Sequence, residues 1–315
     1  MHRTAFIARL TIAAAILLLV ALPAALPRQA IDLMVFAGLY AIAGLGVGLL
    51  LGQCGIVNIA QALFYGIGAY SSAYATVNLG LPPVVGIAAG LAVSAVIAFG
   101  VGWPILRLTG FFLALATLAI GLIGNVLFYE WDWLTGGTLG IGGIPQLDLF
   151  GFVLNTPTRF YYLVWALVVI LLLLAHNLTT GRPGLAMRAM RDAAPAAEVL
   201  AIDMHRLKTQ MFVLCALLGS LAGSLFAHYA AYVSVQSFTV ERSIVFLLIP
   251  VIAGATSVPG IVIGSLFVTL APELLSGFGD AHQMLFGLSL VLVVTLLPEG
   301  LVGLPARLGK RRIAA

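Results

Sequence analysis

Residues 181–208 read GRPGLAMRAMRDAAPAAEVLAIDMHRLK and decide how the rest of the chain is interpreted, because they gather charge in an otherwise apolar sequence. The chain has 15 basic and 11 acidic residues, and eight of these 26 lie in this stretch. In a chain this apolar, such a cluster of charges is expected where it contacts water or a partner protein. The stretch is therefore either an ordinary cytoplasmic loop or a docking surface.

The composition outside that stretch is typical of a polytopic membrane protein. Hydrophobic residues make up 62% of the chain, charged residues only 8%, and the mean hydropathy is +1.14. A soluble protein with so few charges would expose far too much apolar surface. Cys54 and Cys215 show no metal-ligand or CxxC spacing, which indicates small buried side chains.

Apolar stretches of about 20 residues are long enough to cross a bilayer. The first one also resembles a cleavable signal peptide, although we favour a retained span. We expect spans or partial spans at about 5–26, 31–51, 52–80, 83–106, 109–128, 160–178, 210–231, 243–255, 259–276 and 283–304. The sequence therefore predicts an all-α, polytopic transmembrane helical bundle of about nine to ten membrane segments, some short or broken, in one domain covering 1–315.

The basic residues set the expected orientation. Eleven of the fifteen lie in three tracts, namely the N-terminus, 181–208 and the C-terminus from Arg307, which we place in the cytoplasm, with 129–158 as an outer loop. A single crossing at 243–276 would put the C-terminal tract outside. We therefore expect two short helices joined at GATSVPG, as a re-entrant or broken hairpin. Because the basic residues cluster in expected cytoplasmic segments, the positive net charge does not indicate a nucleic-acid partner.

The sequence contains none of the clusters that catalysis in a membrane usually needs. It has no HExxH, no nucleotide-binding GxxxxGK[ST], no paired aspartates and no metal-ligand set. We expect a transport subunit that is not an enzyme and binds no cofactor itself. Glu273 is the one acid inside an apolar run, so it is either a proton site or a residue near the outer end of a short helix.

Uncharged polar side chains are the remaining candidates for a solute path. Asn58 and Gln61 are three residues apart, and we expect them to share a helical face. Such amides also commonly hydrogen-bond between helices, and this alternative stays open. The candidates for the path are Asn58, Gln61, Tyr65, Thr117 and Asn125, with Ser71 and Ser72 nearby.

Within 181–208 the pattern predicts a short helix from Gly184 to about Ala193 and, after an interruption at Pro195, a second turn at 196–200. Leu185, Ala186, Ala189, Met190 and Ala193 are expected to form an apolar side, with Arg188 and Arg191 projecting elsewhere. Arg188 and Asp192 have the i,i+4 spacing of a helical ion pair. Such a helix suits insertion into a groove on a soluble partner.

Six weak motifs in a consistent order make the chain, from about 30 to 304, resemble the permease subunits of branched-chain amino-acid ABC importers (the hydrophobic amino acid uptake transporter family). The strongest pattern, G-R-x-x-x-A-I-R-D-x-x-x-A-A-x-x-x-G-I-N, falls in 181–203. Its matches are Gly181, Arg182, Ala186 through Asp192, Ala196, Ala197, Ile202 and Asp203, and Lys208 and Ala222-Gly223 follow. The other matches are Gly52, Gly55, Phe64, Gly68, Ala69 and Tyr70; Pro104, Arg107, Gly110, Leu113, Ala114, Thr117 and Leu118; Thr135-Gly136-Gly137, Gly140 and Ile144-Pro145; and Pro298, Gly300, Leu301 and Gly303.

The resemblance implies the shorter-loop member of a permease pair in a bacterial inner membrane, with N- and C-termini in the cytoplasm. It also implies two cytoplasmic ATPases that use ATP and Mg²⁺, a paralogous permease, and a periplasmic binding protein. The short helix would seat in an ATPase, and the coupling residues would be Gly184, Arg188, Arg191, Asp192 and Ala197.

The chain departs from the family pattern at several positions. Asn58, Ala60, Gln61 and Ala201 replace the usual Ser, Gly, His and Gly, and the usual G-G-x-G-S is reduced to Gly254, Ala255, Thr256 and Ser257. Since some of these lie where solute would pass, urea, aromatic acids and other amides stay open as substrates. An ion-coupled secondary transporter is the alternative from another class.

Overall fold

The computed structural model describes residues 22–23, 26–149, 152–199, 203–277, 282–296 and 300–301, and these are almost entirely helical. The expected span at 5–26 and the C-terminal basic tract lie outside this part, apart from 22–23 and 26. Its helices are α2 (Arg28–Gly48), the π-helical turn η1 (Leu49–Gln53), α3 (Gln61–Val77), α4 (Pro83–Ile105), α5 (Gly110–Glu130), α6 (Asp132–Thr135), η2 (Gly137–Leu139), α7 (Pro157–Thr180), α8 (Arg182–Asp192), α9 (Ala194–Val199), α10 (Met204–Ala230), η3 (Val235–Phe238), α11 (Val240–Ala253), α12 (Gly260–Leu275) and α13 (His282–Leu296).

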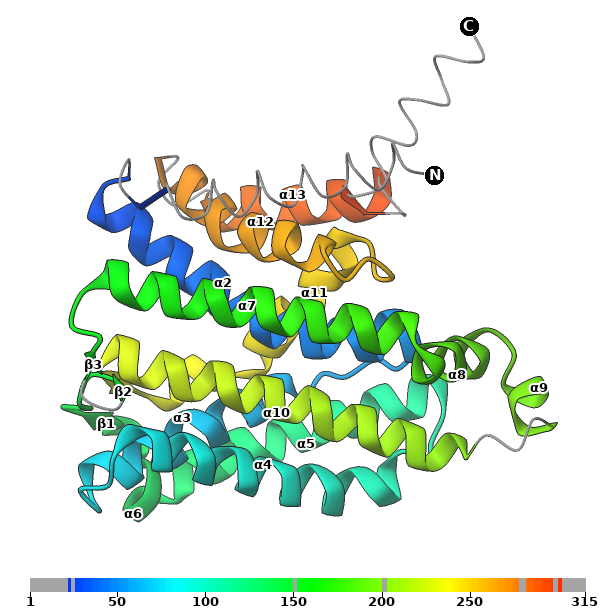
Figure 1. The fold of residues 1–315 in the computed structure, drawn as a ribbon, viewed down its shortest axis with the longest axis horizontal. Coiled ribbons are helices and arrows are strands. Elements are labelled where there is room, and N and C mark those ends of the chain that lie inside the picture. Colours follow the sequence, from blue (N-terminus) through cyan, green and yellow to red (C-terminus); the bar gives the residue numbers. More distant parts are fainter. Residues whose placement is uncertain are drawn as a thin grey trace, which may run out of the picture.

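The long helices lie roughly side by side in one bundle (Figure 1). Within the described residues, five segments are long and apolar enough to cross a membrane: α2 with η1, α4, α5, α7 and α10. The apolar helix α12 and most of α13 are shorter. The prediction of an all-α polytopic bundle with short and broken helices is thereby confirmed.

Burial separates the spans into a centre and a shell. In their most apolar windows, 78% of α2 and 72% of α10 are buried, against 22% of α4 and 28% of both α5 and α7. Large apolar side chains such as Val96, Phe111 and Leu173 are exposed on the shell helices, where lipid would cover them. The functional residues are therefore to be sought around α2 and α10.

Glycine allows the central helices to touch. A Cβ atom at Gly223 of α10 would overlap the carbonyl of Tyr65 in α3, and one at Gly68 of α3 would overlap the carbonyl of Ser220. Small residues at such crossings let backbones approach closely, which is how helices associate in lipid. The buried positions of α4 recur every four residues from Gly86 through Gly90, Ser94 and Ala98 to Gly102, so α4 presents a stripe of small side chains to this pair.

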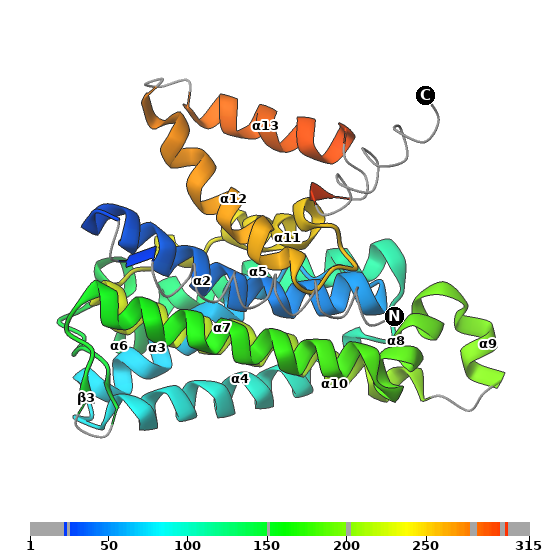
Figure 2. The ribbon, with the colours of Figure 1, turned by 45° about the horizontal axis from the view of Figure 1, so that its top comes forward.

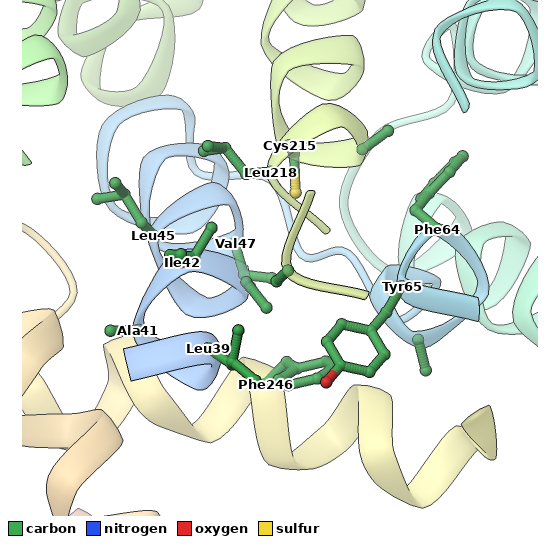
Figure 3. Packing of buried hydrophobic residues seen from close by; sticks show 14 of the residues in the cluster. Leu39, Ala41, Ile42, Leu45, Val47, Phe64, Tyr65, Cys215, Leu218 and Phe246 are labelled. Atoms are coloured by element: carbon green, nitrogen blue, oxygen red, sulfur yellow. The ribbon is translucent and has the colours of Figure 1, made fainter. Parts of the chain in front are cut away.

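Apolar side chains fill the space where the glycines do not bring backbones together. Figure 3 shows Leu39 and Leu45 of α2, Tyr65 of α3, Leu218 of α10 and Phe246 of α11 converging on one cluster. The rings of Tyr65 and Phe246 lie 5.2 Å apart. The centre of the molecule is thus packed from helices that are distant in the sequence.

The segment expected at 52–80 is broken, as predicted. After η1 the backbone is non-helical until α3 begins at Gln61, and Gly55 takes a left-handed φ of 69°. Asn58 lies in this non-helical stretch, so the prediction that it shares a helical face with Gln61 is wrong. The two amides still meet, with Asn58 Nδ2 donating to Gln61 Oε1 at 3.4 Å.

Two small antiparallel strand pairs close the end of the bundle opposite α8 (Figure 1). Strand β1 (Ile141–Gly142) pairs with β4 (Tyr232–Val233), and β2 (Asp148–Leu149) pairs with β3 (Phe152–Val153). The first pair ties the loop after α6 to the end of α10. This is the stretch predicted as the Gly-rich outer loop.

Helices α11 and α12 form the expected hairpin, joined by residues 254–259, and α12 begins at the last glycine of GATSVPG, Gly260. Figure 2 shows α12 leaving the body of the bundle, with α13 packed beyond it. Both hairpin helices are shorter than a full apolar span.

Candidate functional site

Helix α8 lies at one end of the bundle, between the end of α7 and the start of α9 (Figure 2). It begins two residues before the predicted Gly184. The break follows at Ala193, so Pro195 lies in the first turn of α9 and does not separate the two helices. The predicted helix is thus confirmed, and the predicted position of the interruption is wrong by about two residues.

The apolar side predicted for α8 is not the side that is buried. Gly184, Met187 and Met190 face the bundle, whereas Leu185 is 60% exposed. A Cβ atom at Gly184 would overlap the carbonyl of Thr179, so the glycine lets α8 fold back onto the end of α7. Among the predicted apolar residues only Met190 is fully buried: Ala186 and Ala189 are half-buried and Ala193 is exposed.

Arg188 and Arg191, predicted only to project away from the apolar side of α8, both contact the rest of the chain. Arg188 Nη1 donates to the carbonyl of Thr179 at 2.7 Å. Asp192 pairs with its neighbour Arg191, at 2.7 Å from Nε, and the predicted i,i+4 pair with Arg188 is absent. This hydrogen bond lowers the pKa of Asp192 and raises that of Arg191, so the pair stays ionised at neutral pH.

Arg191 also reaches into the bundle, where its Nη1 donates to the carbonyl of Gly52. Gly52 is in η1, where the α-helical pattern has already changed and the chain is about to leave the helix. A Cβ atom at Gly52 would overlap the carbonyl of Ala255, and Gln53 Nε2 donates to the carbonyl of Thr256 at 3.3 Å. We call this contact of α8, η1 and the 254–259 turn the Gly52 junction.

In the sequence, Gly52 had appeared as a family match, Arg191 as a coupling candidate, and 254–257 as a departure within the predicted hairpin joint. Their proximity depends on contacts between residues 139 and 203 positions apart, which periodicity does not report. The one signal available was that both stretches coincide with glycine-containing family patterns.

The polar residues predicted to line a path lie at the centre of the bundle, and most are fully buried. Gln61 Nε2 donates to the carbonyls of Ala43 and Cys215, each at 3.1 Å, which ties α3 to α2 and α10. Thr117 Oγ1 accepts from the amide of Ile59 at 3.2 Å, and Asn125 Nδ2 donates to the carbonyl of Phe238 at 3.4 Å. Tyr65 is 2% exposed, and its hydroxyl has no partner among the described residues.

These contacts supply the broken segment with hydrogen bonds that a helix would otherwise provide. The free amide of Ile59 is met by Thr117, and that of Ala62 by Ser243 Oγ at 2.9 Å. The structure brings Asn58 and Gln61 together, while Thr117 and Asn125 approach from α5. In this conformation the residues hold helices together, and a role in lining a path stays a prediction.

At the opposite end, Ser72 and His228 connect α3, α10 and the loop. Ser72 Oγ lies 2.8 Å from His228 Nε2, and His228 Nδ1 lies 2.8 Å from the carbonyl of Pro145. The carbonyl can only accept, so Nδ1–H donates to it and Nε2 accepts from the hydroxyl. This histidine is buried.

Glu273 is exposed and lies near the end of α12, where its Oε1 accepts a hydrogen bond from Gln29 at 3.1 Å. Its surroundings are those of a residue at a helix end, which was one of the two alternatives. Within the described part of the chain, no three His, Cys, Asp or Glu side chains are placed to hold a metal.

Several known proteins are similar to this chain over most of its length. A family model described as "Branched-chain amino acid transport system / permease component" matches residues 29–294. The chain is 31% identical to the high-affinity branched-chain amino acid transport system permease protein LivM of Salmonella typhimurium and 30% identical to LivM of Escherichia coli, over 93% of this chain and 75% of each relative. It is 25% identical to the permease protein LivH of Escherichia coli, over 84% of this chain and 92% of LivH.

No solved structure matches the chain. Assignment to the shorter-loop paralogue stays a prediction, since the chain is similar to both LivM and LivH. The family match spans the centre of the bundle, the Gly52 junction and α8, and with it the resemblance seen in the motifs is confirmed: the chain is a multi-pass membrane protein that belongs to the branched-chain amino acid transport system permease family.

Proposed function

We propose that this chain is one of two paralogous permease subunits of an ATP-driven importer for branched-chain or related amino acids. Two cytoplasmic ATPases would bind and hydrolyse ATP with Mg²⁺, and a periplasmic protein would deliver the solute. The assembly would lie in a bacterial inner membrane with both termini of this chain in the cytoplasm. The names of LivM and LivH, both permease proteins of one kind of transport system, support a permease pair.

The observation that carries the proposal is that α8 has two different sides. Arg182, Leu185 and Asp192 are exposed at the end of the bundle, whereas Gly184, Met187 and Met190 face inward. The exposed side would seat in an ATPase, and Ala197, buried in α9, would support its far end. Arg188 and Arg191 would then transmit movement inward and not form the docking surface.

Transmission would pass through the Gly52 junction. A displacement of α8 pulls on the carbonyl of Gly52 through Arg191, and η1 is packed against the 254–259 turn. One movement would therefore act on α2, on the broken segment and on the α11–α12 hairpin together. Asn58, Gln61, Tyr65, Thr117 and Asn125, which surround the broken segment, would be exposed to the solute only after such a movement.

The test separates docking from coupling in the reconstituted complex. Leu185→Asp, on the exposed side, should lower the amount of ATPase that co-purifies with the permease pair. Arg191→Glu should leave co-purification and membrane insertion intact while lowering uptake and substrate-stimulated ATP hydrolysis by about tenfold, within the usual range for coupling between sites. Arg107→Glu, at an exposed arginine after α4, is the control for charge reversal. Unchanged uptake in Arg191→Glu would refute the coupling role.

The secondary-transporter alternative rests on Glu273 alone. It requires uptake driven by a proton gradient without ATP, abolished in Glu273→Gln. The exposed position of this carboxylate at a helix end gives that alternative little support.

A further inference from the structure

One face of α2 borders two cavities away from the Gly52 junction. The first, of about 340 Å³, is lined by residues that include Arg28, Asp32 and Phe36, with His228 and Tyr229 from α10. The second, of about 480 Å³, is lined by residues that include Phe36, Tyr40, Arg242 and Thr269. Phe36 lines both. Asp32, Phe36 and Tyr40 follow one another at intervals of four residues, so they lie on one face of the helix.

Arg242 places a positive charge in the second cavity. It comes from the first turn of α11, donates from Nη1 to the Tyr40 hydroxyl, and its guanidinium carbon lies 5.6 Å from the centre of the Tyr40 ring. Among the described residues, no carboxylate forms an ion pair with Arg242. A charge that lines a largely apolar cavity generally needs a counterion.

The rest of the second cavity fits an apolar group with one further polar contact. Leu33, Phe226, Val245, Val268 and Phe286 contribute aliphatic and aromatic walls. Thr269 Oγ1 is buried and has no hydrogen-bond partner in the described part of the chain. A guanidinium and a hydroxyl beside apolar walls are complementary to a carboxylate that carries an apolar side chain.

We propose that this cavity binds an amino acid with an apolar side chain, with Arg242 pairing with its carboxylate and Thr269 donating a second hydrogen bond. The proposal rests on the function proposed above and assigns a site to it. Asp32 and Tyr40 are about 12 Å apart along the axis of α2. Asp32, in the first cavity, is therefore too far away to hold the ammonium group of a molecule whose carboxylate pairs with Arg242.

The experiment uses the complete transporter in lipid nanodiscs and proteoliposomes, with L-leucine as the probe. In competition assays, 4-methylpentanoate has the carboxylate without the amine, and 3-methylbutylamine has the amine without the carboxylate. We expect the carboxylate analogue to compete more strongly in the wild type. Arg242→Gln should raise the KM for leucine about tenfold or more, as expected for the loss of a hydrogen bond to a charged group, and should abolish the difference between the analogues.

Two further variants keep the test independent of folding. Arg242→Lys retains the charge and should restore the preference for the carboxylate analogue. Thr269→Val removes the hydroxyl at nearly constant shape and should raise the KM with little change in kcat. Arg107→Gln removes an exposed arginine elsewhere and should change neither constant.

The outcomes distinguish the site from the function. If the wild type imports leucine with ATP but Arg242→Gln and Thr269→Val keep its KM and its analogue preference, the site is wrong and the proposed function stands. If Arg242→Gln changes only the amount of anionic lipid that co-purifies, the cavity holds a lipid headgroup and the site is again wrong. If the wild type shows no ATP-driven amino-acid uptake, the proposed function itself fails.

Discussion

Helices α3 and α4 follow each other in the chain and pack together, yet their surroundings are opposite. Nearly every residue of α3 is buried, including Gln61, Ser72 and Thr76. In α4 the buried residues are Pro83 and the stripe of small residues from Gly86 to Gly102, while Val96 and Phe99 are exposed. α4 is among the candidate spans by hydropathy and α3 is not. In this pair of helices the stronger apolar signal marks the outside of the bundle, and polar and small residues mark the inside.

Among substitutions that compare buried and exposed positions, the largest difference in stability is expected at glycines. Gly223→Val should destabilise the fold by about 3 kcal/mol or more, because the new side chain meets the backbone of Tyr65 and neither helix can yield without moving the other. The measurement is the yield of monodisperse protein in mild detergent and its thermal midpoint. Gly100→Val, on the exposed side of α4 with nothing near it, is the control. Equal loss in both variants would mean that helix propensity, and not close packing, is responsible.

A smaller effect is expected at buried amides. Gln61→Leu leaves the carbonyls of Ala43 and Cys215 without their donor and should cost about 1–3 kcal/mol in stability. Gln210→Leu, at an exposed position of α10, should change stability little. Thermal unfolding of both variants in the same detergent measures the contrast. A neutral Gln61→Leu would show that the amide is not structural and would strengthen its assignment to a solute path.

The smallest and sharpest contrast lies within α4. Ala98→Val inserts volume at a position that is fully buried and should cost roughly 1–3 kcal/mol. Val96→Ala, two residues earlier and 72% exposed, should stay within about 0.5 kcal/mol of the wild type. Thermal midpoints in one detergent compare the two directly. Similar losses at both positions would contradict the division of α4 into a packed stripe and a lipid-facing surface.

Much of the fold follows from the sequence because helix length in a membrane is set by bilayer thickness. The spans now seen as α4, α5, α7 and α10, the break near 52–60 and the hairpin joined at GATSVPG were all predictable from hydropathy, glycine content and charge. These are local properties. They required no knowledge of which helix packs against which.

The candidate site was less predictable because its contacts join distant residues. Arg191 was predicted to project away from the apolar side of its helix and to take part in coupling, but its bond to the carbonyl of Gly52 could not be foreseen, because that carbonyl becomes available only where η1 ends. Asn58 was placed on a helical face because it is three residues from Gln61, whereas the left-handed Gly55 starts a non-helical stretch. No role was predicted for Arg242 from the sequence, because its lack of a counterion is visible only when the cavity around it is known.

The contacts of α3 also constrain how the protein is made. The carbonyl that receives Gln61 belongs to Cys215, 154 residues later, and the partners of Gly68 and Ser72 in α10 each follow by 156. During synthesis α3 therefore leaves the ribosome long before its hydrogen-bond partners in α10 exist. α3 can complete its packing only after α10 has been translated. The centre of the molecule is therefore assembled late, although it includes a segment that enters the translocon early.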